Sequence, residues 1–115
     1  MEKVELRESK KVDLCKDVQI KHSDRPMTIT LVNISLGGIC FKSESPLKSQ
    51  MIELPYTTLK GKEIILPAQI LHESKDMEKQ LYVYHCRFNN LLRQTLNLLE
   101  REIVDLQLIQ IRMSR

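Results

Sequence analysis

Apolar and polar side chains alternate with a period of two along most of the first 88 residues. In Val12–Lys21, Val18 and Ile20 share one face while Gln19 and Lys21 share the other, which is the pattern of a half-buried strand. The same pattern predicts five further strands: Met27–Ser35, Ile39–Lys42, Met51–Leu54, Lys62–His72 and Leu81–Phe88. Six short strands at this spacing favour a mainly β fold, either an antiparallel barrel or a sandwich.

Turn-forming residues separate these predicted strands. His22–Pro26 predicts a hairpin turn between the first two strands, and the polar run Glu73–Gln80 predicts another turn before the last strand. Pro55 ends the predicted fourth strand, but Pro67 falls inside the fifth. Because proline removes a hydrogen-bond donor from the ladder, we expect an edge position or a bulge at Pro67.

After Phe88 the spacing of apolar residues changes to alternating steps of four and three. This spacing, with Asn89 or Asn90 as the cap, predicts one long helix over residues 89–115. The apolar seam of this helix consists of Leu92, Leu96, Leu99, Ile103, Leu106 and Met113, with Gln110 in the one missing position.

Two roles fit the apolar seam of the helix. It can pack on the strands of its own chain, or it can pair with a second copy of the chain as in a coiled coil. A helix of about 25 residues is about 37 Å long, which exceeds the width of a small barrel. We therefore favour some self-association, and the predicted oligomerisation residues are Leu92, Leu96, Leu99, Ile103 and Leu106.

The length of 115 residues indicates a single domain, with 42% hydrophobic and 29% charged residues as in a soluble globular protein. No apolar run is long enough for a membrane helix, and the charged N-terminus lacks the apolar region of a secretory signal. Cys15, Cys40 and Cys86 are far apart and form no paired motif, so we expect neither disulfides nor a zinc site. A cytoplasmic location is the natural expectation.

The formal net charge is +3, from 18 basic and 15 acidic residues, which does not indicate a general nucleic-acid binder. The local charge is more informative, because Arg7, Lys10 and Lys11 form a compact basic cluster near the N-terminus. On charge alone, this cluster is either a solvated tail or an arm that binds an anion.

The sequence contains no pattern that supports catalysis. His22, His72 and His85 lack the spacing of a metal-binding motif, and no serine lies in a nucleophile elbow. We therefore predict a protein that is not an enzyme, with no catalytic residues, no metal and no cofactor.

The stretch NISLGG, Asn33–Gly38, contains two of the three glycines of the chain. Asn33 and Ser35 are two positions apart on a predicted strand, so their side chains project from the same face. Glycine allows a ligand to approach the backbone closely, or allows a tight turn. Together with the basic cluster, this stretch predicts recognition of a phosphate or a nucleotide.

These residues resemble the motifs of the PilZ domain family. Asn33–Gly38 matches the family's D/N-x-S-x-x-G motif, and Arg7–Lys11 (RESKK) stands where the family carries R-x-x-x-R. The order of the two motifs, of the last strand ending in Arg87 and Phe88, and of the helix also agrees with the family. The resemblance implies a six-stranded antiparallel β-barrel with a C-terminal helix: a basic arm over residues 1–11, the barrel over 12–88 and the helix over 89–115.

The resemblance also implies a ligand, because many PilZ domains, which are bacterial, bind the second messenger cyclic di-GMP. Carried over residue by residue, the expected ligand-binding residues are Arg7, Lys10, Lys11, Asn33, Ser35 and Gly38. Lys11 departs from the motif, because lysine replaces the second arginine. An ammonium group cannot make the two-pronged contact of a guanidinium, so we expect affinity to fall by about one to two decades.

Two functions follow from the resemblance. The first is a cyclic di-GMP receptor whose arm becomes ordered on the barrel and presents a changed surface to a downstream protein, without binding nucleic acid or a membrane. The alternative is a PilZ-fold interaction or oligomerisation module with weak or lost nucleotide binding. Asn33, Ser35 and Gly38 favour the receptor, whereas Lys11 favours the module.

Overall fold

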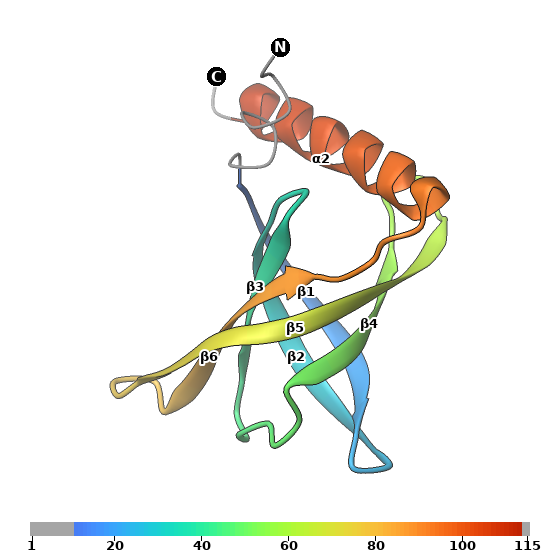
Figure 1. The fold of residues 1–115 in the computed structure, drawn as a ribbon. Coiled ribbons are helices and arrows are strands. Elements are labelled where there is room, and N and C mark those ends of the chain that lie inside the picture. Colours follow the sequence, from blue (N-terminus) through green and yellow to red (C-terminus); the bar gives the residue numbers. More distant parts are fainter. Residues whose placement is uncertain (1–10, 114–115) are drawn as a thin grey trace.

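Six strands and one long helix account for most of residues 11–113, the part of the chain that this computed structural model describes (Figure 1). The predicted mainly β fold is therefore confirmed. The elements are β1 (Val12–His22), β2 (Arg25–Ile34), β3 (Gly38–Ser43), β4 (Met51–Thr57), β5 (Glu63–Asp76), β6 (Leu81–Phe88) and α2 (Arg93–Met113).

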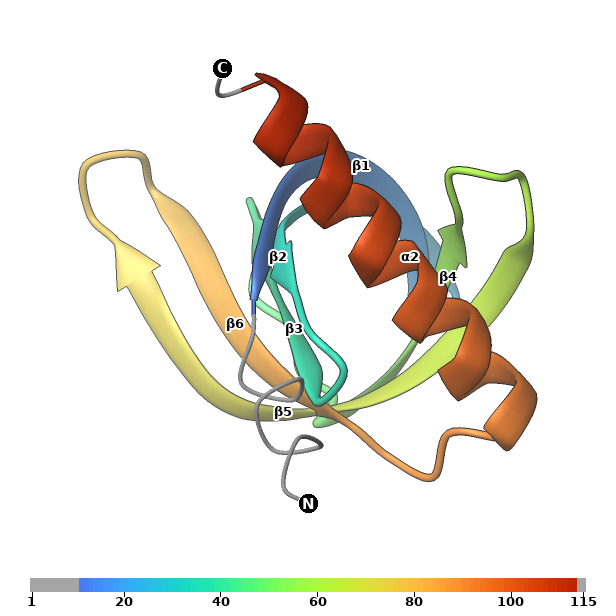
Figure 2. The ribbon, with the colours of Figure 1, turned by 90° about the horizontal axis from the view of Figure 1, so that it is seen from above.

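The strands form one antiparallel sheet in the order β1-β2-β3-β6-β5-β4. The sheet curls until the two outer strands, β1 and β4, contact each other, which makes a nearly closed barrel (Figure 2). At this seam the Lys16 ammonium donates a hydrogen bond to the Thr57 carbonyl and lies 4.2 Å from the centre of the Tyr56 ring. A lysine side chain therefore bridges the two edges of the sheet, and its cation contacts an aromatic face.

The two prolines behave differently from a simple strand break. β4 continues through Pro55 to Thr57, so the predicted end at Leu54 was too early. β4 is an edge strand that pairs only with β5, and proline is tolerated at such an edge. The expected edge position or bulge at Pro67 is wrong, because β5 lies between β4 and β6 and its register shift falls at Leu71. Pro67 is tolerated because the β6 ladder ends at the pair Ala68–Phe88, so no strand there needs its missing N–H, and its carbonyl accepts a hydrogen bond from the Asn89 backbone amide at 3.0 Å.

β5 is longer than predicted, because it continues beyond His72 to Asp76. Its polar end pairs with the start of β6, and the two strands form a hairpin that projects from the barrel (Figure 1). The Asp76 carboxylate accepts hydrogen bonds from the Glu78 and Lys79 amides at 3.1 and 3.2 Å, which closes this turn. The pairing register shifts between Ile70 and His72, so Leu71 is the extra residue of a bulge.

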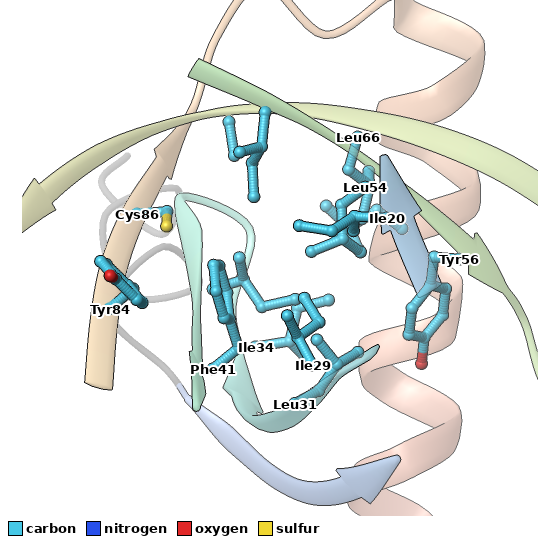
Figure 3. Packing of buried hydrophobic residues seen from close by; sticks show 14 of the residues in the cluster. Ile20, Ile29, Leu31, Ile34, Phe41, Leu54, Tyr56, Leu66, Tyr84 and Cys86 are labelled. Carbon is cyan, nitrogen blue, oxygen red and sulfur yellow. The ribbon is translucent and has the colours of Figure 1, made fainter. Parts of the chain in front are cut away.

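The core fills the barrel interior with the inward members of each alternating pattern (Figure 3). β2 contributes Ile29 and Leu31, as its alternation predicts, and Ile34, which turns inward because the register shifts between Leu31 and Asn33. The rings of Phe41 and Tyr84 pack with their centres 5.4 Å apart. Other labelled residues of this cluster are Ile20, Leu54, Tyr56, Leu66 and Cys86. The barrel is thus closed around a continuous apolar core, which holds the strand ends in fixed positions.

The helix α2 lies across one open end of the barrel (Figure 2). Leu99 and Ile103 are buried against the core, and Glu102 beside them is only 2% exposed. The Glu102 carboxylate accepts hydrogen bonds from the Tyr56 hydroxyl at 2.6 Å and from the Leu59 amide at 2.9 Å. A buried carboxylate with two partners therefore fixes the helix to the end of β4.

Two expectations about the helix need correction. The helix begins at Arg93 rather than at Asn89 or Asn90. The backbone amide of Asn89 donates a hydrogen bond to the Pro67 carbonyl, and Asn90 has a positive φ of 54°, so neither residue caps the helix. The apolar seam is also divided. Leu99 and Ile103 are used by the barrel of the same chain, and Leu106 packs partly against it. Self-association through the helix remains a prediction, and it cannot use Leu99 and Ile103 while the helix is docked.

Candidate functional site

The turn between β2 and β3 is organised around the Ser35 side chain. Its hydroxyl oxygen accepts hydrogen bonds from the amides of Gly37 and Gly38 at 3.2 and 3.3 Å. The Ser35 amide donates to the Gly38 carbonyl at 2.9 Å, and the residue is only 7% exposed. Serine at this position therefore shapes the turn, because a side-chain hydroxyl satisfies two amides that would otherwise lack partners.

The two adjacent glycines of this turn have different roles. Neither has a positive φ, so the turn does not need glycine for a left-handed backbone. A Cβ atom added to Gly38 would lie 2.0 Å from the Cys86 carbonyl oxygen on β6, which leaves no space for any side chain. A Cβ atom on Gly37 would meet only the Ser35 hydroxyl, at 4.0 Å. Gly38 is thus required by the close approach of β3 and β6.

A cavity of about 310 Å³ lies beside this turn. Its lining residues are Lys11, Asn33, Ser35, Gly37, Gly38, Ile39, Cys40, Leu71, His85, Cys86 and Arg87. Four residues expected from the sequence, Lys11, Asn33, Ser35 and Gly38, are therefore brought together at one cavity. The other two, Arg7 and Lys10, lie outside the described residues.

Strand pairing explains why these residues meet. Asn33 pairs with Cys40, Cys40 with His85, and His85 with His72, so these side chains form a row across β2, β3, β6 and β5. Gly38 pairs with Arg87 in the neighbouring row. Register shifts before Asn33 and before His72 bend the sheet on both sides of the cavity. Bulges commonly re-aim side chains at functional sites in this way.

The sequence analysis did not identify Leu71, His85 and Arg87, which also line this cavity. His85 and Arg87 lie on the polar face of the alternating strand β6, and both are exposed. Alternation alone assigns them to the surface, but only the pairing of β3 with β6 places them beside Gly38. The order of the strands in the sheet was therefore the missing signal.

The cavity is electrostatically suited to an anion. Lys11 and Arg87 supply two positive charges, and none of the described residues that line the cavity is acidic. Burial raises the pKa of the Cys40 thiol, while the positive charges of Lys11 and Lys42 oppose that rise. The thiol is thus an uncharged part of the cavity wall, and the charged groups there are basic.

Two histidines lie close together at the edge of this cavity. The rings of His72 and His85 are 5.9 Å apart between their centres. Within residues 11–113, no three His, Cys, Asp or Glu side chains are grouped closely enough to hold a metal ion.

The helix formed by the described residues does not have the length and apolar character needed to cross a membrane.

Two larger cavities have less suitable chemistry for an anion. One of about 780 Å³ lies between α2 and residues 13–16 of β1, where the β1–β2 register shifts. Its walls are mainly apolar, and the Glu102 carboxylate among them is already bonded to Tyr56. Another, of about 700 Å³, combines Lys42 and Lys79 with Asp17 and Glu44, so its charges oppose one another. Both of these cavities are lined in part by acidic side chains, whereas the described lining of the cavity at the β2–β3 turn includes Lys11 and Arg87 and no acidic residue.

Comparison with known proteins gives an independent view of the chain. A model of the PilZ domain family matches residues 5–105. Among solved structures, the chain is similar to the PilZ domain with c-di-GMP of YcgR from Escherichia coli, with a TM-score of 0.71 and 20% sequence identity. This match covers 91% of the chain and 94% of the YcgR domain. A search of curated proteins found no match.

Proposed function

Because the chain belongs to the PilZ domain family, we propose that it is a receptor for cyclic di-GMP that acts through binding rather than catalysis. The observation that carries this proposal is the cavity at the β2–β3 turn. It gathers Lys11, Asn33, Ser35 and Gly38, the described residues of the two family motifs, beside a basic wall. The similar domain of YcgR was solved with c-di-GMP, which supports the same ligand class here.

The chemistry of the cavity fits a cyclic dinucleotide. The ligand carries two negatively charged phosphodiesters, and Lys11 provides an ammonium group for one of them. The Asn33 amide can both donate to and accept from a guanine edge. Leu71 is 58% exposed at the same cavity and offers an apolar surface to the flat face of a base. In this proposal Arg7 and Lys10 complete the site from the arm.

In this proposal the signal passes from the cavity to the helix through two hydrogen bonds, one between backbone groups and one from a side chain of α2. The Gly37 carbonyl accepts a hydrogen bond from the Phe88 amide at 2.9 Å, and Phe88 is the last residue of β6 before the segment that leads to α2. On the other side, Lys11 directly precedes β1, where the Asp13 carbonyl accepts a hydrogen bond from Gln110 of α2. Ordering of the arm on the ligand would therefore act on both ends of the helix, and so on the surface that a partner protein reads.

Isothermal titration calorimetry with purified chain and cyclic di-GMP tests this proposal. We expect saturable binding that is weaker than for an intact R-x-x-x-R motif, and cyclic di-AMP should bind less tightly because adenine lacks the guanine O6 acceptor. Arg7→Ala should abolish binding, and Lys11→Arg should tighten it. Absence of heat at high micromolar ligand would contradict the receptor function.

The alternative function, an interaction or oligomerisation module, has its own supporting observation. Several large apolar side chains of α2 and of the segment before it face solvent in a single chain: Leu92, Leu96, Val104, Leu108 and Ile109. Such a surface is typical of one that contacts another protein or a second copy of the chain. Light scattering tests this alternative, which predicts a mass above the 13.5 kDa of one chain.

A further inference from the structure

We propose that Arg87 of β6 supplies, from the barrel, the guanidinium contact that Lys11 cannot make from the arm. This inference rests on the proposed function, and it assigns to Arg87 the binding of a phosphate of the cyclic dinucleotide. It is not visible in either motif, because Arg87 belongs to the last strand.

The position of Arg87 follows from its partner on β3. Arg87 pairs directly with Gly38, which has no side chain and whose backbone is pressed against Cys86 of the same strand. A Cβ atom at position 38 would lie 2.0 Å from the Cys86 carbonyl oxygen, so no side chain fits there and none from this position stands beside Arg87. Glycine instead leaves the Arg87 side chain bordering open space, and Arg87 lines the cavity together with Lys11.

The guanidinium is held without being neutralised. Its Nη2 atom donates a hydrogen bond to the Gln69 side-chain oxygen at 3.2 Å, on the β5 side of Arg87. The same oxygen accepts from the Asn89 side chain at 3.4 Å. Gln69 is uncharged, and no carboxylate among residues 11–113 lines this cavity. The arginine is thus oriented by a neutral amide and keeps its full charge for an anion.

The chemistry of arginine then decides what it binds. A guanidinium presents two parallel N–H donors to two oxygens of one phosphate, whereas the ammonium of Lys11 acts as a single point charge. Lys11 precedes β1 and Arg87 lies near the end of β6, so the two cations approach the cavity from different strands. A phosphate between them would be held by a fork on one side and by a point charge on the other.

Calorimetry on matched variants tests the role of Arg87. We expect Arg87→Ala to weaken cyclic di-GMP binding by about ten- to a hundredfold, the effect of losing one bidentate pair. Arg87→Lys should recover only part of this loss, because it restores charge without the fork. Adding Lys11→Arg to Arg87→Ala should recover much of the affinity. Arg25→Ala, in the β1–β2 hairpin at the start of β2, is the control and should bind like the natural chain.

The possible outcomes separate this inference from the proposed function. If the natural chain binds and Arg87→Ala binds equally well, the role of Arg87 is wrong while the receptor function stands. If Arg87→Ala loses affinity for cyclic di-GMP but not for cyclic di-AMP, the arginine reads a guanine edge and the assignment to phosphate is overturned. If the natural chain does not bind, both proposals fail. Thermal unfolding of each variant shows whether a loss of binding reflects a loss of fold.

Discussion

The Tyr56 hydroxyl donates a 2.6 Å hydrogen bond to the Glu102 carboxylate, and this contact joins the last part of β4 to the middle of α2. Burial raises the pKa of Tyr56, and its hydrogen bond to Glu102 and the negative charge of that carboxylate raise it further. The tyrosine therefore remains a donor throughout the neutral range. The attachment of the helix to the barrel depends on a polar contact as well as on apolar packing.

Removal of Glu102 should loosen the helix. We expect Glu102→Ala to lower the free energy of unfolding by about 3 kcal/mol, because the Tyr56 hydroxyl and the Leu59 amide both lose their buried acceptor. Tyr56→Phe should cost less, since Glu102 keeps the Leu59 amide. Urea unfolding measures these changes, and Glu53→Ala on the exposed face of β4 is the matched control. Equal stabilities of Glu102→Ala and Glu53→Ala would show that the contact is not stabilising.

The neighbouring glycines of the turn should respond very differently to alanine. Gly38→Ala forces β3 and β6 apart, because its Cβ would lie 2.0 Å from the Cys86 carbonyl oxygen, and we expect a loss of about 1–3 kcal/mol. Gly37→Ala places its Cβ 4.0 Å from the Ser35 hydroxyl and should change stability by less than about 1 kcal/mol. Thermal unfolding of the two variants makes the comparison. Similar melting temperatures would contradict the close approach of the strands.

Alkaline pH should destabilise the fold through Cys86. Burial, assisted by the nearby Cys40, raises the pKa of the Cys86 thiol from an ordinary value of 9.0 to about 12. Between these two pH values the thiol loses its proton in the unfolded chain but keeps it in the folded chain. Ionisation therefore lowers the free energy of the unfolded state relative to the folded state. The contribution of the protonated Cys86 thiol to the free energy of unfolding is therefore fully present below pH 9 and is lost as the pH rises toward 12.

Cys86→Ala isolates this contribution. We expect its free energy of unfolding to fall less steeply with pH than that of the natural chain between pH 9 and 10.5, even though the variant is less stable at neutral pH. Urea unfolding at several pH values measures both slopes. Parallel slopes would mean that Cys86 does not contribute to the alkaline transition.

The two apolar faces of α2 should be separable by mutation. Leu99 is fully buried in the core, so Leu99→Lys should lower the free energy of unfolding by several kcal/mol, on the order of 3 or more. Leu108 is exposed, and Leu108→Lys should leave the melting temperature almost unchanged while reducing any self-association. Light scattering and thermal unfolding together distinguish these effects. A mass that is equal in the natural chain and in Leu108→Lys would exclude this face from an interface.

The strands were predictable because burial imposes a period of two on β4 and on parts of the other strands, whereas the choice of a barrel over a sandwich came from the resemblance to the PilZ family. What the alternation could not show was where strands end: β4 continues through Pro55, and β5 continues past the bulge at Leu71 into a polar hairpin. These endings depend on edge position and on pairing between strands, which are properties of the whole sheet.

The candidate site was predictable only where its residues belong to a short sequence motif. Asn33, Ser35 and Gly38 form a short motif, and Lys11 was identified from the resemblance to a family. Arg87 and His85 join them through the β3–β6 ladder, which no local pattern encodes. The exposed side of α2 was likewise hidden, because the helix period shows an apolar seam without showing which part of it faces the barrel.

The hydrogen bond from the Phe88 amide to the Gly37 carbonyl gives the site and the helix one shared segment of backbone. Energetic coupling through such a connection is reciprocal: if a ligand at the turn changes the docking of α2, a change in docking must alter ligand affinity by the same factor. If the chain is the receptor proposed above, a protein that binds the helix in one position would act as an effector of ligand binding as well as a target of the signal. Under that proposal, the concentration of the partner protein would help to set the ligand concentration at which the chain responds.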